Sequence, residues 1–184
     1  MTVRTDAEDP TDENLMLALR DGDDAAIGVL MGRWELPVKA FLLRLGVGSE
    51  QVDDIAQDSF VRLYQQRHRY RTGAAFKPWF LTLAGNLGRN AIRWRKRHPG
   101  ATGESMAEPR EPGPDPARQA LLHDEGERVR AAIRSLPLPL REAVLCVDLE
   151  GLRHAEAAAV MRCSTKAVEK RLHRARALLR AALG

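Results

Sequence analysis

The residues with the clearest chemical potential lie between positions 154 and 180, where a short apolar segment precedes a basic one. Small apolar residues recur at helical spacing over 154–161, and Arg162-Cys163 interrupts the pattern. Ser164, or the threonine after it, can cap a second helix through its hydroxyl. The outward positions of that helix are Lys166, Glu169, Lys170, His173, Arg174 and Arg176. A short helix, a tight turn and a longer basic helix predict a helix-turn-helix, whose second helix enters the DNA major groove.

Charge distribution favours DNA over the alternative, an ordinary amphipathic hairpin with a solvated charged face. The formal net charge is +4, but residues 1–24 hold eight acids against two bases. The bases therefore concentrate elsewhere, in Arg89–Arg97 and Arg171–Arg180. Two basic blocks indicate a polyanion that is contacted twice.

Composition argues against several other classes of protein. The two cysteines, Cys146 and Cys163, lie in apolar helical pattern, which predicts buried thiols and no metal site or disulfide. No apolar run reaches membrane-spanning length, and the acidic start is unlike a signal peptide. No Gly-rich phosphate loop or nucleophile motif is present. We expect a soluble, cytoplasmic protein that is not an enzyme and has no cofactor.

An acidic face is predicted on a helix over 49–70, which Ser49 would cap. Two helices precede it, one after Thr11 and one over 27–45 with an expected kink or local break at Pro37. The exposed side of the 49–70 helix carries Asp53, Asp54, Gln57, Asp58 and Arg62. Carboxylates on an open helix face have no pocket to shift their pKa, which argues against catalysis. A solvated face and a protein-docking face both remain open.

Aromatic and basic residues occur together over 67–97, a combination typical of single-stranded nucleic acid platforms. Pro78 suits the first turn of a helix that runs from Trp79 to about Arg97. Trp79 and Phe80 fit core positions of that helix. Phe76 falls in the preceding loop, which makes it the better candidate for a base contact.

The predicted fold is all-α, with two small helical domains joined by a Pro-rich linker. Half of the ten prolines fall within 99–116, a composition that cannot form a core. The first domain is expected over 11–98 and the second over 117–183.

Four stretches, in order along the chain, resemble bacterial sigma factors of the sigma-70 family, in the small extracytoplasmic-function group that keeps only regions 2 and 4. Val52–Tyr64 resembles region 2.2, and Phe76–Arg97 resembles regions 2.3 and 2.4. Residues 135–152 resemble region 4.1, and the hairpin with Arg171–Arg176 resembles region 4.2. The resemblance covers nearly all of residues 12–182, and it implies recruitment of RNA polymerase to promoters.

The resemblance also implies partners and site residues. The partners would be core RNA polymerase (its β′ clamp and β flap), promoter DNA and an anti-sigma factor. Polymerase would bind the acidic face with Asp53, Asp54, Gln57, Asp58 and Arg62. The −10 element would be held by Phe76, Asn86, Arg89, Asn90, Arg93 and Arg97. The −35 element would be held by Lys166, Glu169, Lys170, Arg171, His173, Arg174 and Arg176, of which Lys166, Arg171 and Arg176 hold phosphates or form local salt bridges.

Two other functions are compatible with parts of the chain. A helix-turn-helix regulator that acts without polymerase would explain the second domain and leave the first without a role. An adaptor or anti-sigma-like protein would use the same helices only for protein contacts. The chain also departs from the family at Asn90, where aspartate is common, and at His154, Ala155 and Ala157, where bulkier residues are common.

The first prediction concerns Glu169, which stands at a position where a basic residue is common in the family. Glutamate accepts a hydrogen bond from cytosine N4 and is repelled by phosphate, so we expect an unusual −35 preference. Glu169→Lys should change the −35 motif recovered in a selection of bound sequences. Recovery of the same motif by the wild-type protein and by Glu169→Lys would contradict this expectation.

Overall fold

The computed structural model describes residues 9–98 and 116–184, and of these the side chains of 9–98 and 126–184. Every regular element in these ranges is a helix, which confirms the all-α prediction. The first module comprises α1 (Asp12–Arg20), α2 (Ala25–Leu45), α3 (Ser49–Gln66), the 3₁₀ turn η1 (Arg67–Arg69) and α4 (Phe76–Arg97). The second comprises α5 (Pro116–Ser135), α6 (Leu138–Val144), the π-helical turn η2 (Leu145–Leu149), α7 (His154–Met161) and α8 (Thr165–Leu183). The predicted linker lies outside the described residues except for Pro116, which begins α5.

Several predicted helix boundaries are confirmed by their capping groups. The Thr11 side chain accepts from the Asn14 backbone amide at 3.2 Å, and the Ser164 side chain accepts from Ala167 at the same distance. Gly46, which has φ 108°, ends α2 in the left-handed conformation that suits glycine.

Two other predictions about boundaries are wrong. Ser49 is the first residue of α3 and not its cap, a position that Gly48 takes without a side-chain hydrogen bond. The helix predicted to reach Tyr70 ends at Gln66 and continues as η1. Of the kink or local break expected at Pro37, the break is absent, since α2 runs through that residue. Pro37 lies on the exposed side of α2, where water can hydrate the carbonyl that lost its donor.

Aromatic rings form the centre of the first module. Phe80 lies 5.5 Å from Phe76 and 5.0 Å from Phe60, measured between ring centroids, and Trp34 meets both Phe76 and Phe80 edge-on. These contacts tie α2 and α3 to the first turns of α4. The position of α4, which carries the first basic block, is therefore set by the core.

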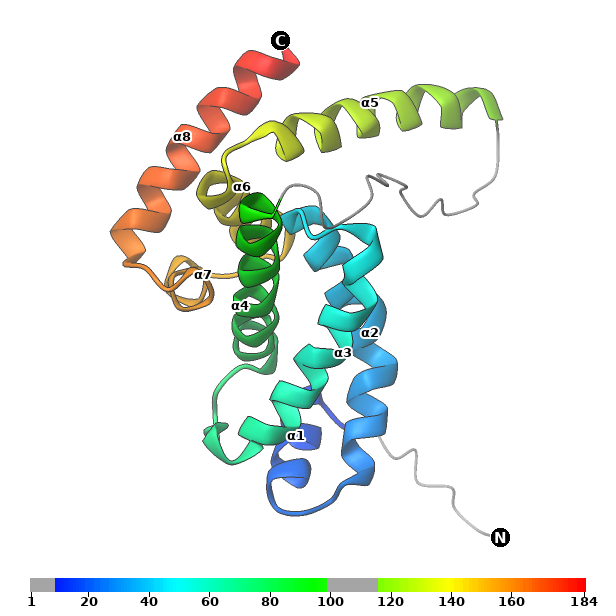
Figure 1. Ribbon diagram of the computed structural model, residues 1–184, viewed down its shortest axis with the longest axis vertical. Helices are drawn as coiled ribbons and strands as arrows, with labels where there is room; N and C mark the ends of the chain where they lie inside the picture. The colour runs from blue at the N-terminus through cyan, green and yellow to red at the C-terminus, as the bar shows by residue number, and fades with distance from the viewer. Residues whose placement is uncertain (1–8, 99–115) are drawn as a thin grey trace, which may run out of the picture.

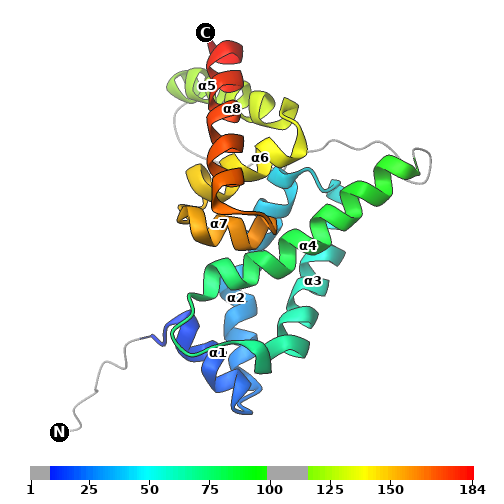
Figure 2. The same ribbon diagram turned by 90° about the vertical axis from the view of Figure 1, so that its left-hand side faces the viewer.

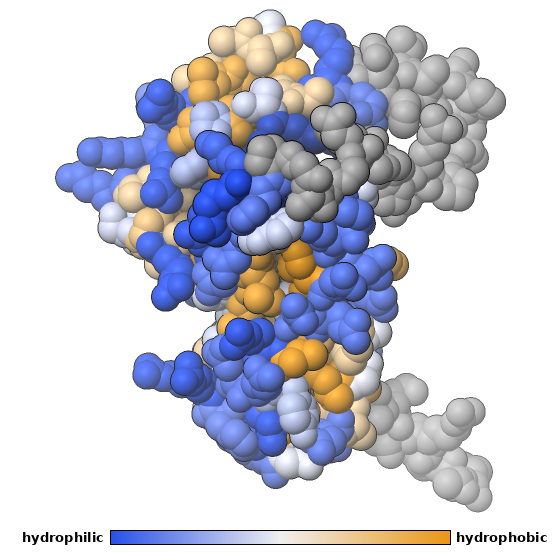
Figure 3. Space-filling view, in the orientation of Figure 1, coloured by the Kyte–Doolittle hydropathy of each residue, from blue (hydrophilic) through white to orange (hydrophobic). Residues whose placement is uncertain are grey.

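The two modules pack against each other along α4. Helices α4 and α7 lie side by side in both views, with α1–α3 on one side of α4 and the second module on the other (Figures 1 and 2). Hydrophilic side chains cover most of the face in Figure 3, and hydrophobic ones gather at the waist between the modules and near the end of α8. The interior of each module thus continues into the other.

Gly88 of α4 gives a prediction about this core. An added Cβ would lie 2.9 Å from Leu42 Cδ2 and 3.1 Å from Leu45 Cδ2, and both leucines are fully buried. Gly88→Ala should therefore destabilise the fold by about 1–3 kcal/mol through overpacking. Gly32→Ala is the matched control, because Gly32 is an exposed helical glycine with open space around it. That control should gain about 0.5–1 kcal/mol from helix propensity. Equal urea midpoints for the two variants would contradict the packing of α4 on α2.

Candidate nucleic-acid interface

A helix-turn-helix is present where the sequence predicts it. Arg162 adopts the left-handed conformation (φ 53°) just after α7, and Ser164 then caps α8. Val168, Leu172 and Ala175 are the buried residues of α8, and they hold it on α6 and α7. This packing leaves the opposite side of α8 exposed, which is the geometry that a recognition helix needs.

The charged residues of α8 divide into an outward group and a flanking group. Lys166, Lys170, His173 and Arg174 are exposed and lie roughly opposite the buried face. The flanking residues have partners within the chain: Arg176 Nη2 lies 2.5 Å from Asp148 Oδ1, and Glu169 Oε1 lies 3.8 Å from His154 Nδ1. The local salt bridge expected of Arg176 is thus present. Glu169 lies on the side of α8 that faces the start of α7.

A second basic face lies on the last turns of α4. Arg93, Asn90 and Arg97 are exposed, and Arg93 Nη2 donates to Asn90 Oδ1 at 2.8 Å. Arg95 instead donates to the Gly46 carbonyl at 2.6 Å, where it satisfies the end of α2. Only part of the Arg-rich sequence is therefore free to face a phosphate.

Arg89, one turn earlier on α4, is covered by the second module. Its guanidinium donates to the Glu142 carboxylate of that module and to the Asn86 side chain of α4, and the side chains of Arg89 and Glu142 are only 12% and 4% exposed. Burial raises the pKa of Glu142 above its ordinary value, although the charge and hydrogen bond of Arg89 act in the opposite direction. One residue predicted to hold DNA, Arg89, therefore forms a buried contact between the modules, and Asn86 lies half-buried beside it.

Further contacts join the modules around this ion pair. Arg141 donates to the Leu45 carbonyl at 3.0 Å, which caps α2 from the second module. At the other end of the contact, Lys77 Nζ lies 2.9 Å from Glu150 Oε2 and donates to the Glu150 carbonyl at 2.7 Å.

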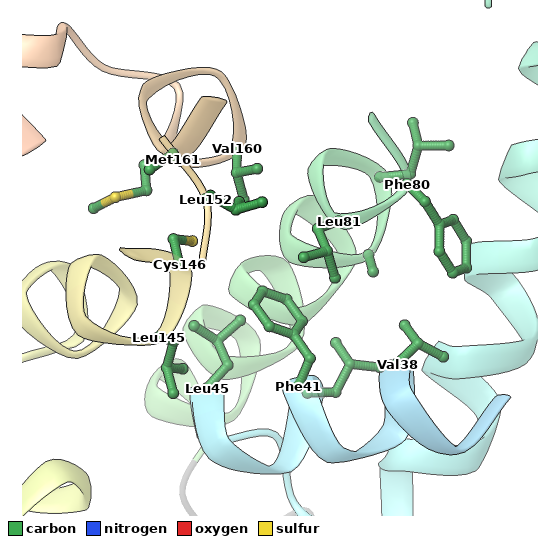
Figure 4. Close-up of a cluster of buried hydrophobic side chains, with 14 of the residues drawn as sticks. Val38, Phe41, Leu45, Phe80, Leu81, Leu145, Cys146, Leu152, Val160 and Met161 are labelled. Atoms are coloured by element: carbon green, nitrogen blue, oxygen red, sulfur yellow. The ribbon is translucent and has the colours of Figure 1, made fainter. Parts of the chain in front are cut away.

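Apolar side chains fill the space between these polar contacts. Figure 4 shows Phe41, Leu45 and Leu81 of the first module facing Leu145 and Val160 of the second. All five are at most 1% exposed. At Gly85 of α4, an added Cβ would be 3.7 Å from Val160 of α7, which is ordinary van der Waals contact. Helices α4 and α7 thus pack directly against each other at this point.

The expected position of Phe76 is wrong. Phe76 is the first residue of α4 and not part of a loop, and its ring is fully buried against Trp34 and Phe80. The periodicity of the sequence placed the helix start at Trp79, three residues late, because the cap of α4 comes from elsewhere: Glu13 of α1 accepts from the Phe76 amide at 2.9 Å. A base contact by this ring would require it to leave the core.

The acidic face of α3 is exposed as predicted. Asp53, Asp54, Gln57, Asp58 and Arg62 all lie on the outside of α3. Asp53 forms an ion pair with Lys39 of α2 at 2.9 Å. The face is therefore available for a protein partner.

Within the described ranges, no group of three His, Cys, Asp or Glu side chains could hold a metal ion, and no helix is long and apolar enough to cross a membrane. Cys146 is buried, and burial raises the pKa of its thiol; Cys163 is half-buried. The prediction of a buried thiol is confirmed for Cys146 and is only partly right for Cys163.

Two family models match the chain in the order of its two modules. Residues 30–98 match sigma-70 region 2, and residues 126–179 match sigma-70 region 4. The chain is 33% identical to the RNA polymerase sigma factor NccH of Alcaligenes xylosoxydans xylosoxydans, over 95% of this chain and 96% of that protein. It is 30% identical to the ECF RNA polymerase sigma-E factor of Escherichia coli K12, over 92% and 93% of the two chains. The chain belongs to the extracytoplasmic-function group of the sigma-70 family.

Solved structures agree with this assignment. CnrH in complex with the cytosolic domain of CnrY has a TM-score of 0.69 at 27% identity, over 94% of this chain and 96% of that one. The sigma factor RpoE of Bartonella quintana, in complex with the anti-sigma factor NepR, shares the fold with a TM-score of 0.68 at 22% identity, over 85% and 95% of the two chains. As a sigma factor, this protein directs promoter-specific initiation of transcription by RNA polymerase. The match to region 2 begins inside α2 and leaves α1 outside it.

The residues that join the modules were not anticipated from the sequence. Glu142 and Arg141 lie inside the stretch that resembles region 4.1, but sequence pattern gives no sign that their partners belong to region 2. In the sequence, Glu13 is one of the acids of the N-terminal segment, and nothing marks it as the cap of a later helix. The one available signal was Glu142 itself, a charged residue on the apolar side of a short helix.

The Arg89–Glu142 ion pair gives a prediction about the contact between the modules. Glu142→Gln leaves the half-enclosed guanidinium without a counter-charge, which should lower the free energy of unfolding by about 1–3 kcal/mol. Replacing both residues by leucine should restore most of the loss, because an apolar pair does not have to be desolvated as ions. Asp148→Asn is the matched control, since it breaks the exposed pair with Arg176, worth about 0–1 kcal/mol. Equal urea midpoints for Glu142→Gln and Asp148→Asn would contradict a buried pair.

Proposed function

We propose that this sigma factor uses two DNA-binding surfaces, the α4 face for the −10 element and the outward face of α8 for the −35 element. The observation that carries the proposal is the exposure of two basic helix faces on separate modules. Lys170, His173 and Arg174 would contact base edges, and Lys166 would contact phosphate. Arg93, Arg97 and Asn90 would hold the −10 duplex, joined by Asn86 and, once the second module no longer covers it, by Arg89.

The acidic face of α3 is the proposed docking site for the β′ clamp of core RNA polymerase. Its support is the continuous exposed row from Asp53 to Arg62, which has no partner in the second module among the described contacts. The second module would meet the β flap. We place the domains at 11–98 and 117–183, with the linker over 99–116 between them.

Promoter binding requires the modules to separate. The two elements, centred roughly 25 base pairs apart, lie about 85 Å from each other at about 3.4 Å per base pair. Modules in direct contact through α4 and α7 cannot reach both. An extended linker of 18 residues spans about 60 Å at about 3.3 Å per residue, which together with the modules themselves covers the distance. We propose that polymerase selects the separated form, since a ligand shifts an equilibrium only by its preference for one state.

An anti-sigma factor is the further proposed partner. CnrH and the Bartonella sigma factor were solved in such complexes, and the present chain aligns with CnrH over both modules. Purification of the tagged protein from its source cells would identify the partner, and recovery of polymerase alone would argue against one.

Run-off transcription with purified core polymerase and a promoter library from the source genome tests the proposed function. Transcripts from a defined pair of motifs should appear only when the protein is added. The variant Lys170→Ala/Arg174→Ala should reduce them at least tenfold, because each base contact contributes about 1–3 kcal/mol. Arg180→Ala, an exposed arginine further along α8, is the matched control and should have little effect.

Two outcomes of the run-off experiment would contradict the proposal. No stimulation, together with tight duplex binding by the protein alone, would indicate a regulator that acts without polymerase. Unchanged transcription by the double variant would indicate that the α8 face makes only protein contacts.

A further inference from the structure

The segment 71–75, which joins η1 to α4, is exposed in this structure even though the modules are closed. Four of its five residues are exposed, and only Ala74 is half-buried. Gly73 has φ 81°, and the Ala74 amide donates to the Arg71 carbonyl at 3.1 Å across the turn. Under the proposed function α4 carries the −10 contacts, from Asn86 to Arg97, and this turn directly precedes that helix. What holds its conformation therefore bears on promoter opening.

Helix α1 contacts this turn at both ends. The Glu13 carboxylate accepts from the Phe76 amide at 2.9 Å, and Arg20 Nη1 lies 3.2 Å from Thr72 Oγ1. The residue at the cap position of α4, Ala75, has no side chain that could accept the Phe76 amide. Glu13 thus supplies the cap of α4 from a helix 63 residues earlier in the chain.

Tyr70 fixes the turn from inside. Its ring is 2% exposed, and its hydroxyl donates to the Ala74 carbonyl. Burial, with the charges of Glu13 and Asp12, raises the pKa of Tyr70 to about 12, so the hydroxyl keeps its proton near neutral pH.

Helix α1 is itself rigidly attached to the module. Leu15, Met16 and Leu19 are buried against the core, and Asp12 Oδ2 accepts from Trp34 Nε1 at 2.7 Å. Glu13 and Arg20 are therefore presented from a fixed helix, and the turn is held relative to the core as well as relative to α4.

We propose that α1 is a positioning element for promoter opening: Glu13 and Arg20 hold the turn 71–75 in the conformation that accepts an unstacked base of the −10 element. This inference rests on the proposed function of α4. A carboxylate beside a DNA-binding turn repels phosphate and weakens non-specific attraction. Loss of the Glu13 charge should therefore leave non-specific DNA binding equal or stronger while it impairs recognition. A purely structural cap would not separate the two properties in this way.

The test uses holoenzyme assembled from core polymerase and the full chain, on a promoter found in the run-off experiment. Glu13→Gln should lower transcription from the intact duplex roughly fivefold, because the amide oxygen that remains is a weaker acceptor than a carboxylate. It should also reduce the base preference at one −10 position, measured on a panel of single-base substitutions. The base preferences at the −35 positions should be unchanged. Thr72→Val, which keeps the side-chain shape and removes the bond to Arg20, should act at the same position. This second variant tests the turn if Glu13→Gln folds poorly.

Glu156→Gln is the matched control. Glu156 caps α7 in the same way, accepting from the Arg153 amide at 2.8 Å, but it lies in the second module. It should leave every −10 preference unchanged. An unaltered −10 preference in both Glu13→Gln and Thr72→Val would overturn the positioning role and leave the proposed function intact. An equal loss of base preference at all −10 and −35 positions would also overturn it, because that result would indicate a general loss of stability. Failure of the wild-type chain to initiate at all would instead refute the proposed function.

Discussion

Helix α4 is packed on two opposite sides, and most of the structure depends on that double use. Its first turns lie among the rings of Trp34, Phe60 and Phe80, and its middle lies against α7. A helix that is buried on two sides has only a narrow exposed face, and that face carries the basic residues. Any partner of α4 must use that strip or displace α7.

Under the proposed function, the second module and DNA compete for the same part of α4. Arg89 can pair with Glu142 or with a phosphate, but not with both. The closed form gains buried apolar contact from side chains such as Leu81 and Val160, whereas the open form gains contacts to polymerase and promoter. The balance is therefore set by partners that prefer the open form.

Polar contacts in this protein act mainly at helix ends. Arg141 and Arg95 satisfy carbonyls at the end of α2, and Glu13 satisfies an amide at the start of α4. Each comes from a different helix, and Arg141 and Arg95 add to the local cap that Gly46 already gives α2. Such contacts orient one helix relative to another, which apolar packing alone specifies less strictly. They are suited to holding a DNA-binding turn at a defined angle.

The sequence by itself determined the helices, the helix-turn-helix and the acidic face of α3, because these depend on periodicity and on local capping groups such as Ser164 and Gly46. It also carried the family resemblance, since motif order is a property of the chain. Only the tertiary structure decided that Phe76 is core, that Arg89 is covered, and that Glu13 caps α4. Each of these depends on a partner dozens of residues away in the chain. Helical periodicity tells which side of a helix is apolar, but not which segment will cover it, and a charged residue looks the same in sequence whether it faces water or a buried counter-charge.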